Sequence, residues 1–272
     1  MSYPLAEVAS AVERLWPISG AEDWDASGLI AGHPDDEVSR VLLAVDAVDA
    51  VVGEALDTGA DLLLVHHPLL LRGVTSVAAD RYKGSVLTAL IRARCALLAA
   101  HTNADVVGDG TSGVFAERLG LLSVEPIVPA GDGTTGIGRV GQLDAPTSLG
   151  HLAHRIAYLL PATATGIRVA GDYDRIVERV ALCGGAGDSL LNEDLVRSAD
   201  VYITSDLRHH PASESVEQSR VGGGPALIDV SHWASEWLWL DRAAEQLAAI
   251  LPDLDITVSD LRTDPWDFAV TQ

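Results

Sequence analysis

The chain has 272 residues, of which 48% are hydrophobic and 21% are charged. This apolar fraction excludes a disordered chain, and the length is enough for one large domain or two modest ones. With 18 Lys and Arg against 39 Asp and Glu, the formal net charge is −21. A surface this acidic argues against unspecific binding to nucleic acid or to an anionic membrane, because both need a basic surface.

The sequence also lacks the features of membrane-spanning, secreted and disulfide-rich proteins. The sequence has no uncharged apolar stretch of about 18 residues, which predicts that no transmembrane helix forms. The first residues lack a basic start followed by an apolar core, so we expect no signal peptide. Cys95 and Cys183 are the only cysteines, too few for a disulfide framework in a chain of this length. We therefore expect a cytoplasmic protein.

Apolar runs alternate with segments of helical spacing along the first half of the chain. The runs are continuous, which is typical of strands buried on both faces of a parallel α/β sheet. The pattern predicts strands over 40–45, 61–65 and 95–100 and helices over 47–58, 84–93 and 111–119, the last closed by Gly120. The Pro- and Gly-rich stretch 124–135 is predicted to be a connector.

The second half of the chain resembles the first. Val38-Ser-Arg-Val-Leu-Leu is similar to Val177-Glu-Arg-Val-Ala-Leu, and Arg40 and Asp61 are separated by 21 positions, as are Arg179 and Asp200. Chance similarity between apolar strands is the alternative, but the identical spacing favours a true repeat. We expect two related α/β lobes with mostly parallel central sheets and a cleft between them. The approximate ranges are 1–128 and 129–272, the second including a βα segment over 137–170.

Three polar clusters directly follow predicted strands, where ligands bind in open α/β sheets. They are the adjacent pair His66 and His67, the pair His101 and Asp105, and the pair His232 and Glu236. The last two residues are four apart and share one face of a helix that Ser231 would cap. Imidazole and carboxylate groups in this number are about right for two divalent metal ions sharing a carboxylate.

Each cluster also has a structural interpretation. One histidine of the first pair can cap a turn while the other faces solvent. Asp105 can cap the helix that follows it. The third pair can be a surface ion pair. The repeat favours the metal hypothesis, because it places the three clusters at equivalent strand ends of two lobes, where they would converge if the lobes faced each other.

Several motifs together resemble a known family. They are Trp24-Asp25-Ala26-Ser27-Gly28-Leu29, Val65-His66-His67-Pro68, His101-Thr102-Asn103-Ala104-Asp105, Gly136-Ile-Gly-Arg-Val-Gly141, Cys183-Gly-Gly-Ala-Gly187, Tyr202-Ile-Thr-Ser-Asp206 and Asp229-Val-Ser-His-Trp-Ala-Ser-Glu236. Any one of these motifs is weak evidence for a family. In this order and spacing they are specific to one family, and they cover nearly the whole chain. The sequence resembles the NGG-one-interacting-factor-three-like family, whose members are often labelled GTP cyclohydrolase 1 type 2 homologue.

The resemblance implies a dinuclear metal centre between the lobes, with two divalent ions per subunit, either Zn, Fe or Mn. Its ligands would be His66, His67, Asp105, His232 and Glu236. Glu236 would bridge the ions, and His101 would lie beside them as an acid/base group or substrate contact. The resemblance also implies a toroidal hexamer built from trimers. The family often has Asn at position 26 and Gly at positions 205 and 231, where this chain has Ala26, Ser205 and Ser231.

The resulting hypothesis is a metal-dependent hydrolase acting on a small, nucleotide-like substrate, as in GTP ring opening. Arg72, Arg139 or Arg208 would offset the charge of a substrate phosphate. The alternative hypothesis is a non-enzymatic metal-binding regulator or a scaffold that binds a partner.

Overall fold

The computed structural model describes residues 1–131 and 133–271, which form two compact units. Unit 1 comprises residues 1–104 and 240–263, and unit 2 comprises residues 105–239 and 264–272. Among the described residues, no helix combines the length and the apolar character needed to cross a membrane.

Unit 1 is built on a mixed sheet with a parallel core. The strands are β1 (Tyr3–Pro4), β2 (Gly28–Ala31), β3 (Glu37–Val38), β4 (Arg40–Ala44), β5 (Leu62–Val65), β6 (Ala96–Ala99) and β15 (Asp255–Val258). The order in the sheet is β15-β4-β5-β6-β2, in which β2 alone runs antiparallel to its neighbour, and β1 pairs with β3. β15 belongs here because it pairs in parallel with β4, although it follows unit 2 in the sequence.

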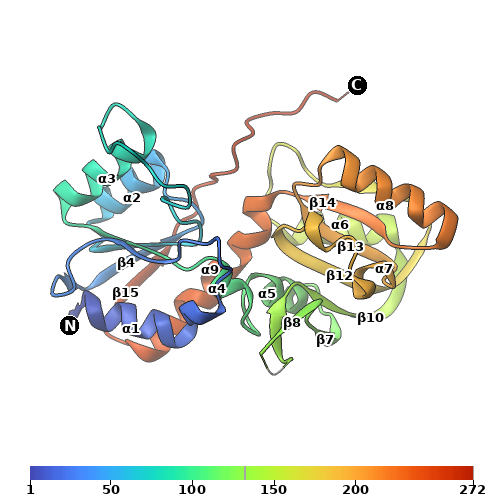
Figure 1. The fold of residues 1–272 in the computed structure, drawn as a ribbon, viewed down its shortest axis with the longest axis horizontal. Coiled ribbons are helices and arrows are strands. Elements are labelled where there is room, and N and C mark those ends of the chain that lie inside the picture. Colours follow the sequence, from blue (N-terminus) through green and yellow to red (C-terminus); the bar gives the residue numbers. More distant parts are fainter. Residues whose placement is uncertain (132, 272) are drawn as a thin grey trace. The chain divides into compact units, whose positions relative to one another are not determined.

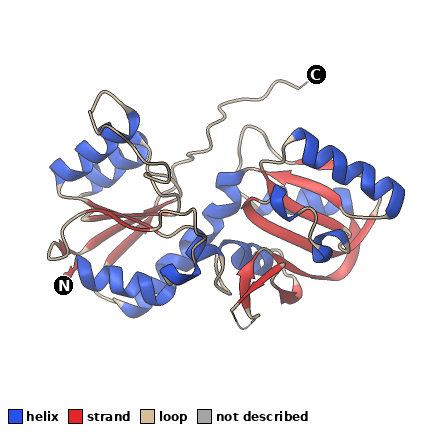
Figure 2. Ribbon diagram, in the orientation of Figure 1, coloured by secondary structure: helices blue, strands red, loops and turns tan. Residues whose placement is uncertain are grey.

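Helices cover both faces of this sheet. α2 (Asp49–Thr58) and α3 (Tyr82–Ala93) lie on one face, and α1 (Leu5–Leu15) and the second part of α9 (His232–Ile250) lie on the other (Figures 1 and 2). α2 ends where Gly59 adopts the left-handed region, at φ 65°. A short helical turn over Ile18–Gly20 follows α1. Leu42, Leu63 and Leu97 from the central strands pack against α2 and α3, so the continuous apolar runs mark strands buried on both faces.

Unit 2 contains a second mixed sheet, in the order β11-β14-β13-β12-β10-β7. Its strands are β7 (Leu122–Glu125), β10 (Arg139–Ser148), β11 (Arg168–Ala170), β12 (Ile176–Ala186), β13 (Val201–Ser205) and β14 (Ala226–Val230). β12, β13 and β14 are parallel, and the other pairs are antiparallel. The helices are α5 (Thr111–Arg118), α6 (Leu149–Leu159), α7 (Asp194–Arg197), α8 (His209–Gly222) and the first part of α9, with a helical turn over Asp188–Leu190.

The predicted connector over 124–135 is only partly irregular. It contains the end of β7, all of β8 (Val128–Ala130) and the start of β9 (Thr135–Ile137), and Asp132 lies outside the described residues. β8 pairs with β9 and β7 pairs with β10. Pairing with these partners outweighs the local preference of Pro and Gly for turns, which is why the composition alone was misleading.

The two sheets share a detail that supports the internal repeat. Oδ2 of Asp61 accepts hydrogen bonds from the backbone N–H groups of Ser39 and Arg40, both at 2.9 Å. Oδ2 of Asp200 accepts the same bonds from Glu178 at 2.9 Å and from Arg179 at 2.8 Å. The matching spacing of these aspartates therefore reflects one hydrogen-bonding pattern. In both units an aspartate carboxylate binds two backbone N–H groups at the start of a central strand.

Candidate metal centre

Three histidines gather at the carboxyl ends of neighbouring strands in unit 1. His66 and His67 follow β5, and their N–H groups continue the ladder to Ala44 and Val45 at 3.1 and 2.9 Å. His101 follows β6, and its ring centroid lies 5.1 Å from that of His66 and 5.4 Å from that of His67. The ring nitrogens that the three residues offer all lie within 4.8 Å of one another.

Each of these rings is oriented by a hydrogen bond at Nδ1. Nδ1 of His66 lies 2.9 Å from the carbonyl oxygen of Ala100. Nδ1 of His67 lies 2.7 Å from Oδ1 of Asp46, and Nδ1 of His101 lies 2.8 Å from Oδ1 of Asp25. A carbonyl or carboxylate oxygen only accepts, so each Nδ1 carries the proton. In the neutral ring Nε2 then keeps the lone pair that a metal ion needs.

The aspartates behind these rings are themselves held in place. Burial alone would raise the pKa of Asp25, but hydrogen bonds from Thr102 and His101 outweigh it and hold that pKa well below its usual value. Oδ2 of Asp46 accepts a hydrogen bond from Thr263 at 2.5 Å. Both carboxylates are therefore positioned as fixed acceptors, the arrangement that orients histidine ligands in metal sites.

A second set of donors lies at the start of α9 in unit 2. Ser231 caps this helix by accepting a hydrogen bond from the N–H of Ala234 at 3.2 Å, as the sequence predicted. Nε2 of His232 lies 3.0 Å from Oε1 of Glu236, whose side chain is buried. Nδ1 of His232 lies 2.7 Å from Oδ2 of Asp206, so this ring also directs Nδ1 at a carboxylate.

The two carboxylates set the charge of His232. Burial alone would lower the pKa of His232, but Glu236 and Asp206 outweigh it and hold that pKa well above its usual value. When His232 is protonated, its positive charge balances the negative charge of the buried Glu236 carboxylate. A divalent cation in its place would satisfy the same two side chains, so the pair fits a metal ion by the chemistry of its donors.

Gly185 leaves room for this pair. It is the next-to-last residue of β12 and has φ 69°, a conformation that favours glycine. A Cβ at this position would lie 2.3 Å from Oε1 of Glu236 and 3.3 Å from Nε2 of His232. Its N–H donates to Oγ of Ser235 at 2.9 Å, which links the end of β12 to α9. Gly184, Gly185 and Ala186 are thus the last residues of β12, where the strand pairing with β13 is irregular, and Gly185 lies against His232 and Glu236.

Asp105, the last residue of α4 (Thr102–Asp105), also lies in unit 2. Its Oδ1 accepts a hydrogen bond from Thr111 at 2.5 Å. Burial above all, and then the charges of Asp105 and Glu236, raise the pKa of Cys183 to about 12. Cys183 is therefore a protonated thiol, buried in the core of unit 2.

Of the arginines proposed to bind phosphate, Arg139 is committed elsewhere. Its side chain is buried and donates to the carbonyl oxygens of Gly136 at 2.6 Å, Gly138 at 2.7 Å and Val107. These bonds make it a structural cation, so the sequence hypothesis is wrong for this residue. Nε of Arg208 lies 2.5 Å from Asp188, and Arg72 is exposed.

Sequence reasoning did not single out Asp25, Asp46 or Asp206 as partners of histidine rings. Asp25 and Asp206 stand inside the motifs quoted above, and Asp46 follows β4 by two positions. For Asp46 and Asp206 the available signal was their place just beyond a strand end, whereas Asp25 comes before β2. The pairings themselves join residues between 21 and 76 positions apart, which spacing along the chain does not reveal.

A family model described as Duf34/NIF3 (NGG1p interacting factor 3) matches residues 4–265. The chain belongs to the Duf34/NIF3 family. A Streptomyces coelicolor member named GTP cyclohydrolase 1 type 2 homolog is 49% identical, over 96% of this chain and 93% of its own. A Mycobacterium bovis member of the same name is 34% identical, over 98% of this chain and 97% of its own.

Solved structures agree with the family assignment. A Bacillus cereus protein related to NIF3 superposes with a TM-score of 0.89 at 23% identity, covering 98% of this chain and 99% of that one, and it supports the fold alone. A hypothetical protein of Staphylococcus aureus gives a TM-score of 0.87 at 26% identity, covering 98% and 99% of the two chains. The expectation of two related α/β lobes is therefore confirmed, and the chain has the Duf34/NIF3 fold over nearly its whole length.

Proposed function

We propose that this Duf34/NIF3 protein is a metal-dependent hydrolase with a dinuclear centre. The proposed ligands are those of the sequence hypothesis, His66, His67, Asp105, His232 and Glu236. The observation that supports it most is the common orientation of the imidazoles. His66, His67 and His232 each direct Nδ1 at a carbonyl or carboxylate oxygen. Hydrogen bonds of this kind leave Nε2 to serve as the ligand atom.

The two divalent ions would supply Lewis acidity to a substrate held beside them. His101 would hold or accept a proton at Nε2, because Asp25 fixes its Nδ1–H at 2.8 Å. The buried carboxylate of Glu236 would balance the charge of the ions. Since mixed imidazole and carboxylate sites accept Zn, Fe and Mn, availability rather than these ligands would decide the metal.

The proposed substrate is a small nucleotide-like molecule. This part of the proposal rests on the name GTP cyclohydrolase 1 type 2 homolog, which the Streptomyces coelicolor and Mycobacterium bovis relatives carry. The reaction would be hydrolysis, either of the purine ring or of a phosphate ester of the nucleotide, and it would involve no redox change.

Metal content tests the ligand set first. The purified chain is expected to bind two equivalents of Zn or Mn, and His66→Ala and Asp105→Ala are each expected to bind less. The matched control is His33→Ala, since His33 is an exposed histidine of unit 1. Two equivalents bound by both ligand variants would show that the ligand set is wrong.

Activity is tested separately on the loaded protein. Zn-, Mn- and Fe-loaded samples would be assayed on GTP and a panel of other nucleotides. Turnover that disappears in Glu236→Ala, with an unchanged melting temperature, would support the hydrolase. Two bound equivalents with no turnover on any nucleotide would instead favour a non-enzymatic metal-binding protein.

A further inference from the structure

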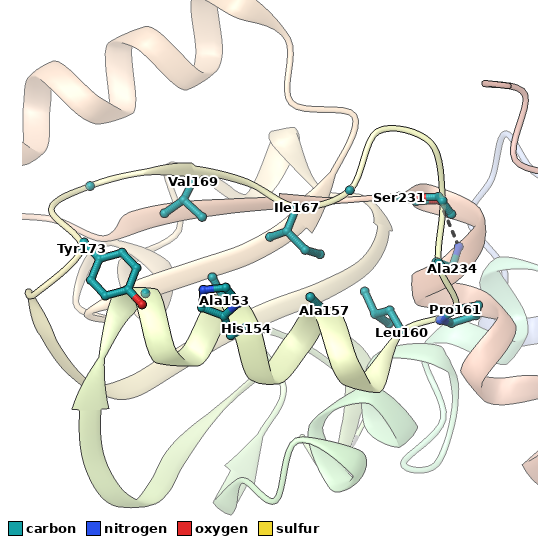
Figure 3. A pocket seen from close by; sticks show the side chains of 15 residues that line it. Ala153, His154, Ala157, Leu160, Pro161, Ile167, Val169, Tyr173, Ser231 and Ala234 are labelled. Carbon is teal, nitrogen blue, oxygen red and sulfur yellow. Dashed lines mark hydrogen bonds between the residues drawn. The ribbon is translucent and has the colours of Figure 1, made fainter. Parts of the chain in front are cut away.

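Unit 2 contains an apolar pocket whose lining includes none of the proposed ligands. Its volume is about 520 Å³, and it runs between α6 and the segment that includes β11 (Figure 3). Ala153 and Ala157 line it from α6, and Ile167 and Val169 line it from the opposite wall. Tyr173 lies at one end in Figure 3, and Ser231 and Ala234 lie at the other. Pockets of this size hold large side chains or small ligands.

The strand beside this pocket has an open edge. In the part of the chain that the structure describes, β11 is a terminal strand of its sheet and pairs with β14 only. Its other edge therefore offers backbone N–H and C=O groups to a further strand. A second hollow of about 420 Å³ is lined by all three residues of β11, and Asp229 and His209 also line it. Because successive side chains of a strand point to opposite faces, a strand added to this edge would find Val169 and the apolar pocket on one face and the guanidinium of Arg168 on the other.

The segment after Asp264 has the complementary pattern. Trp266, Phe268 and Val270 alternate along it and are 61%, 79% and 79% exposed. Asp267 lies between the first two. In an extended chain the three apolar side chains share one face, and Asp267 lies on the other. Exposed apolar side chains in such a row mark a surface that binds a partner.

This segment begins beside the pocket but leaves it open. Oδ1 of Asp264 accepts a hydrogen bond from Oγ of Ser231, a residue that lines the pocket, at 2.7 Å. The pocket and the row of apolar side chains are therefore both present and both open in a single copy. When one chain carries two complementary surfaces that do not meet within it, the two surfaces can meet between copies. Such a contact is head-to-tail.

We propose that Pro265–Val270 of a second copy of this chain adds as a strand to the open edge of β11. Trp266, Phe268 and Val270 would fill the pocket beside α6, and Asp267 would face Arg168. The side chain of Arg168 pairs with Asp229 and is 68% exposed, so it can also receive the incoming carboxylate. Backbone hydrogen bonds would give affinity, and the alternating side chains would set the register.

Cysteine cross-linking between two chains of different length tests this contact. One chain carries Ala157→Cys, the other carries Trp266→Cys and a longer tag, and the two are expressed together. Cys95 and Cys183 are buried, so they do not compete. Mild oxidation is expected to give a mixed covalent dimer as the main product. The control is Tyr158→Cys in place of Ala157→Cys, because Tyr158 is the next residue on α6 and is 91% exposed.

Two results would overturn the proposal. One is a mixed dimer that is absent or no more abundant than with the Tyr158→Cys control. The other is a chain carrying both cysteines that gives only a cross-linked product of monomer size, which would show that the segment docks on its own chain.

A binding measurement covers the case in which a cysteine variant folds poorly. The chain with Trp266→Asp and Phe268→Asp leaves its pocket open, and a fluorescent peptide of residues 263–271 is titrated into it. Saturable binding is expected, with at least a tenfold loss in Ala157→Phe, which fills the pocket, and no loss in Tyr158→Phe. No binding, or equal binding by both helix variants, would contradict the proposal.

Discussion

Nδ1 of His67 lies 2.7 Å from Oδ1 of Asp46, a carboxylate that follows the neighbouring parallel strand. The bond fixes both the orientation and the tautomer of a proposed metal ligand. Removing such a partner costs about 10- to 100-fold in metal affinity at known sites. Asp46→Asn is therefore expected to weaken metal binding by about that factor, measured by competition with a chelator. The control is Asp57→Asn on the exposed side of α2, and equal affinities in the two variants would contradict this role.

Asp25 is expected to act on proton transfer rather than on metal content. It fixes Nδ1 of His101, and acid/base groups contribute about 10²- to 10⁴-fold to turnover. Asp25→Asn should therefore lower kcat by about 10²-fold or more with two metal equivalents still bound. Asp23→Asn, an exposed neighbour, is the control. A loss of metal with no separate effect on kcat would assign His101 as a ligand instead.

Gly185→Ala should disturb the pair His232 and Glu236. The added Cβ would lie 2.3 Å from Oε1 of Glu236, and the residue would keep φ 69°. Strain of this kind costs about 1–3 kcal/mol, which chemical denaturation measures. Metal content should fall as well, because Glu236 must move. Gly108→Ala is a fair comparison, since a Cβ there meets no atom within 4 Å. Similar unfolding curves for the two variants would show that the backbone around residue 185 adjusts with no loss in the free energy of unfolding.

Asp61 should stabilise unit 1 in a way that depends on pH. Burial raises its pKa, but hydrogen bonds from the N–H groups of Ser39 and Arg40 outweigh this and lower the pKa below its usual value. The ionised form is thus favoured in the folded state. Its contribution is present above about pH 4, the value for an unfolded aspartate, and is lost as the pH falls through the lower folded pKa.

The corresponding variant is Asp61→Asn, which should reduce the free energy of unfolding by about 1–3 kcal/mol at neutral pH. The difference from the parent chain should shrink as the pH is lowered, and urea titrations at several pH values measure it. Asp80→Asn removes an exposed carboxylate of the same unit and should change little. A difference that stays constant down to pH 2 would rule out the ionised carboxylate as the cause.

The sequence by itself determined the central strands and the helices beside them in unit 1. Continuous apolar runs predicted the central strands, because burial on both faces leaves no polar alternation. Equal spacing of Asp61 and Asp200 predicted the repeat, and both make the same backbone hydrogen bonds. His232 and Glu236 were expected on one helix face, and they lie 3.0 Å apart. The strands and the helix pair follow from the local periods of strand and helix, and the repeat follows from one spacing that occurs twice.

Only the tertiary structure decided which groups orient the histidines and which chain segments complete each unit. Asp25 lies 76 positions from His101, and β15 pairs with β4 from the far end of the sequence. Arg139 is occupied by backbone carbonyls, although its charge alone suggested a phosphate. Such contacts arise when distant segments are packed together. Their partners depend on the fold as a whole, so no regular spacing in the sequence predicts them.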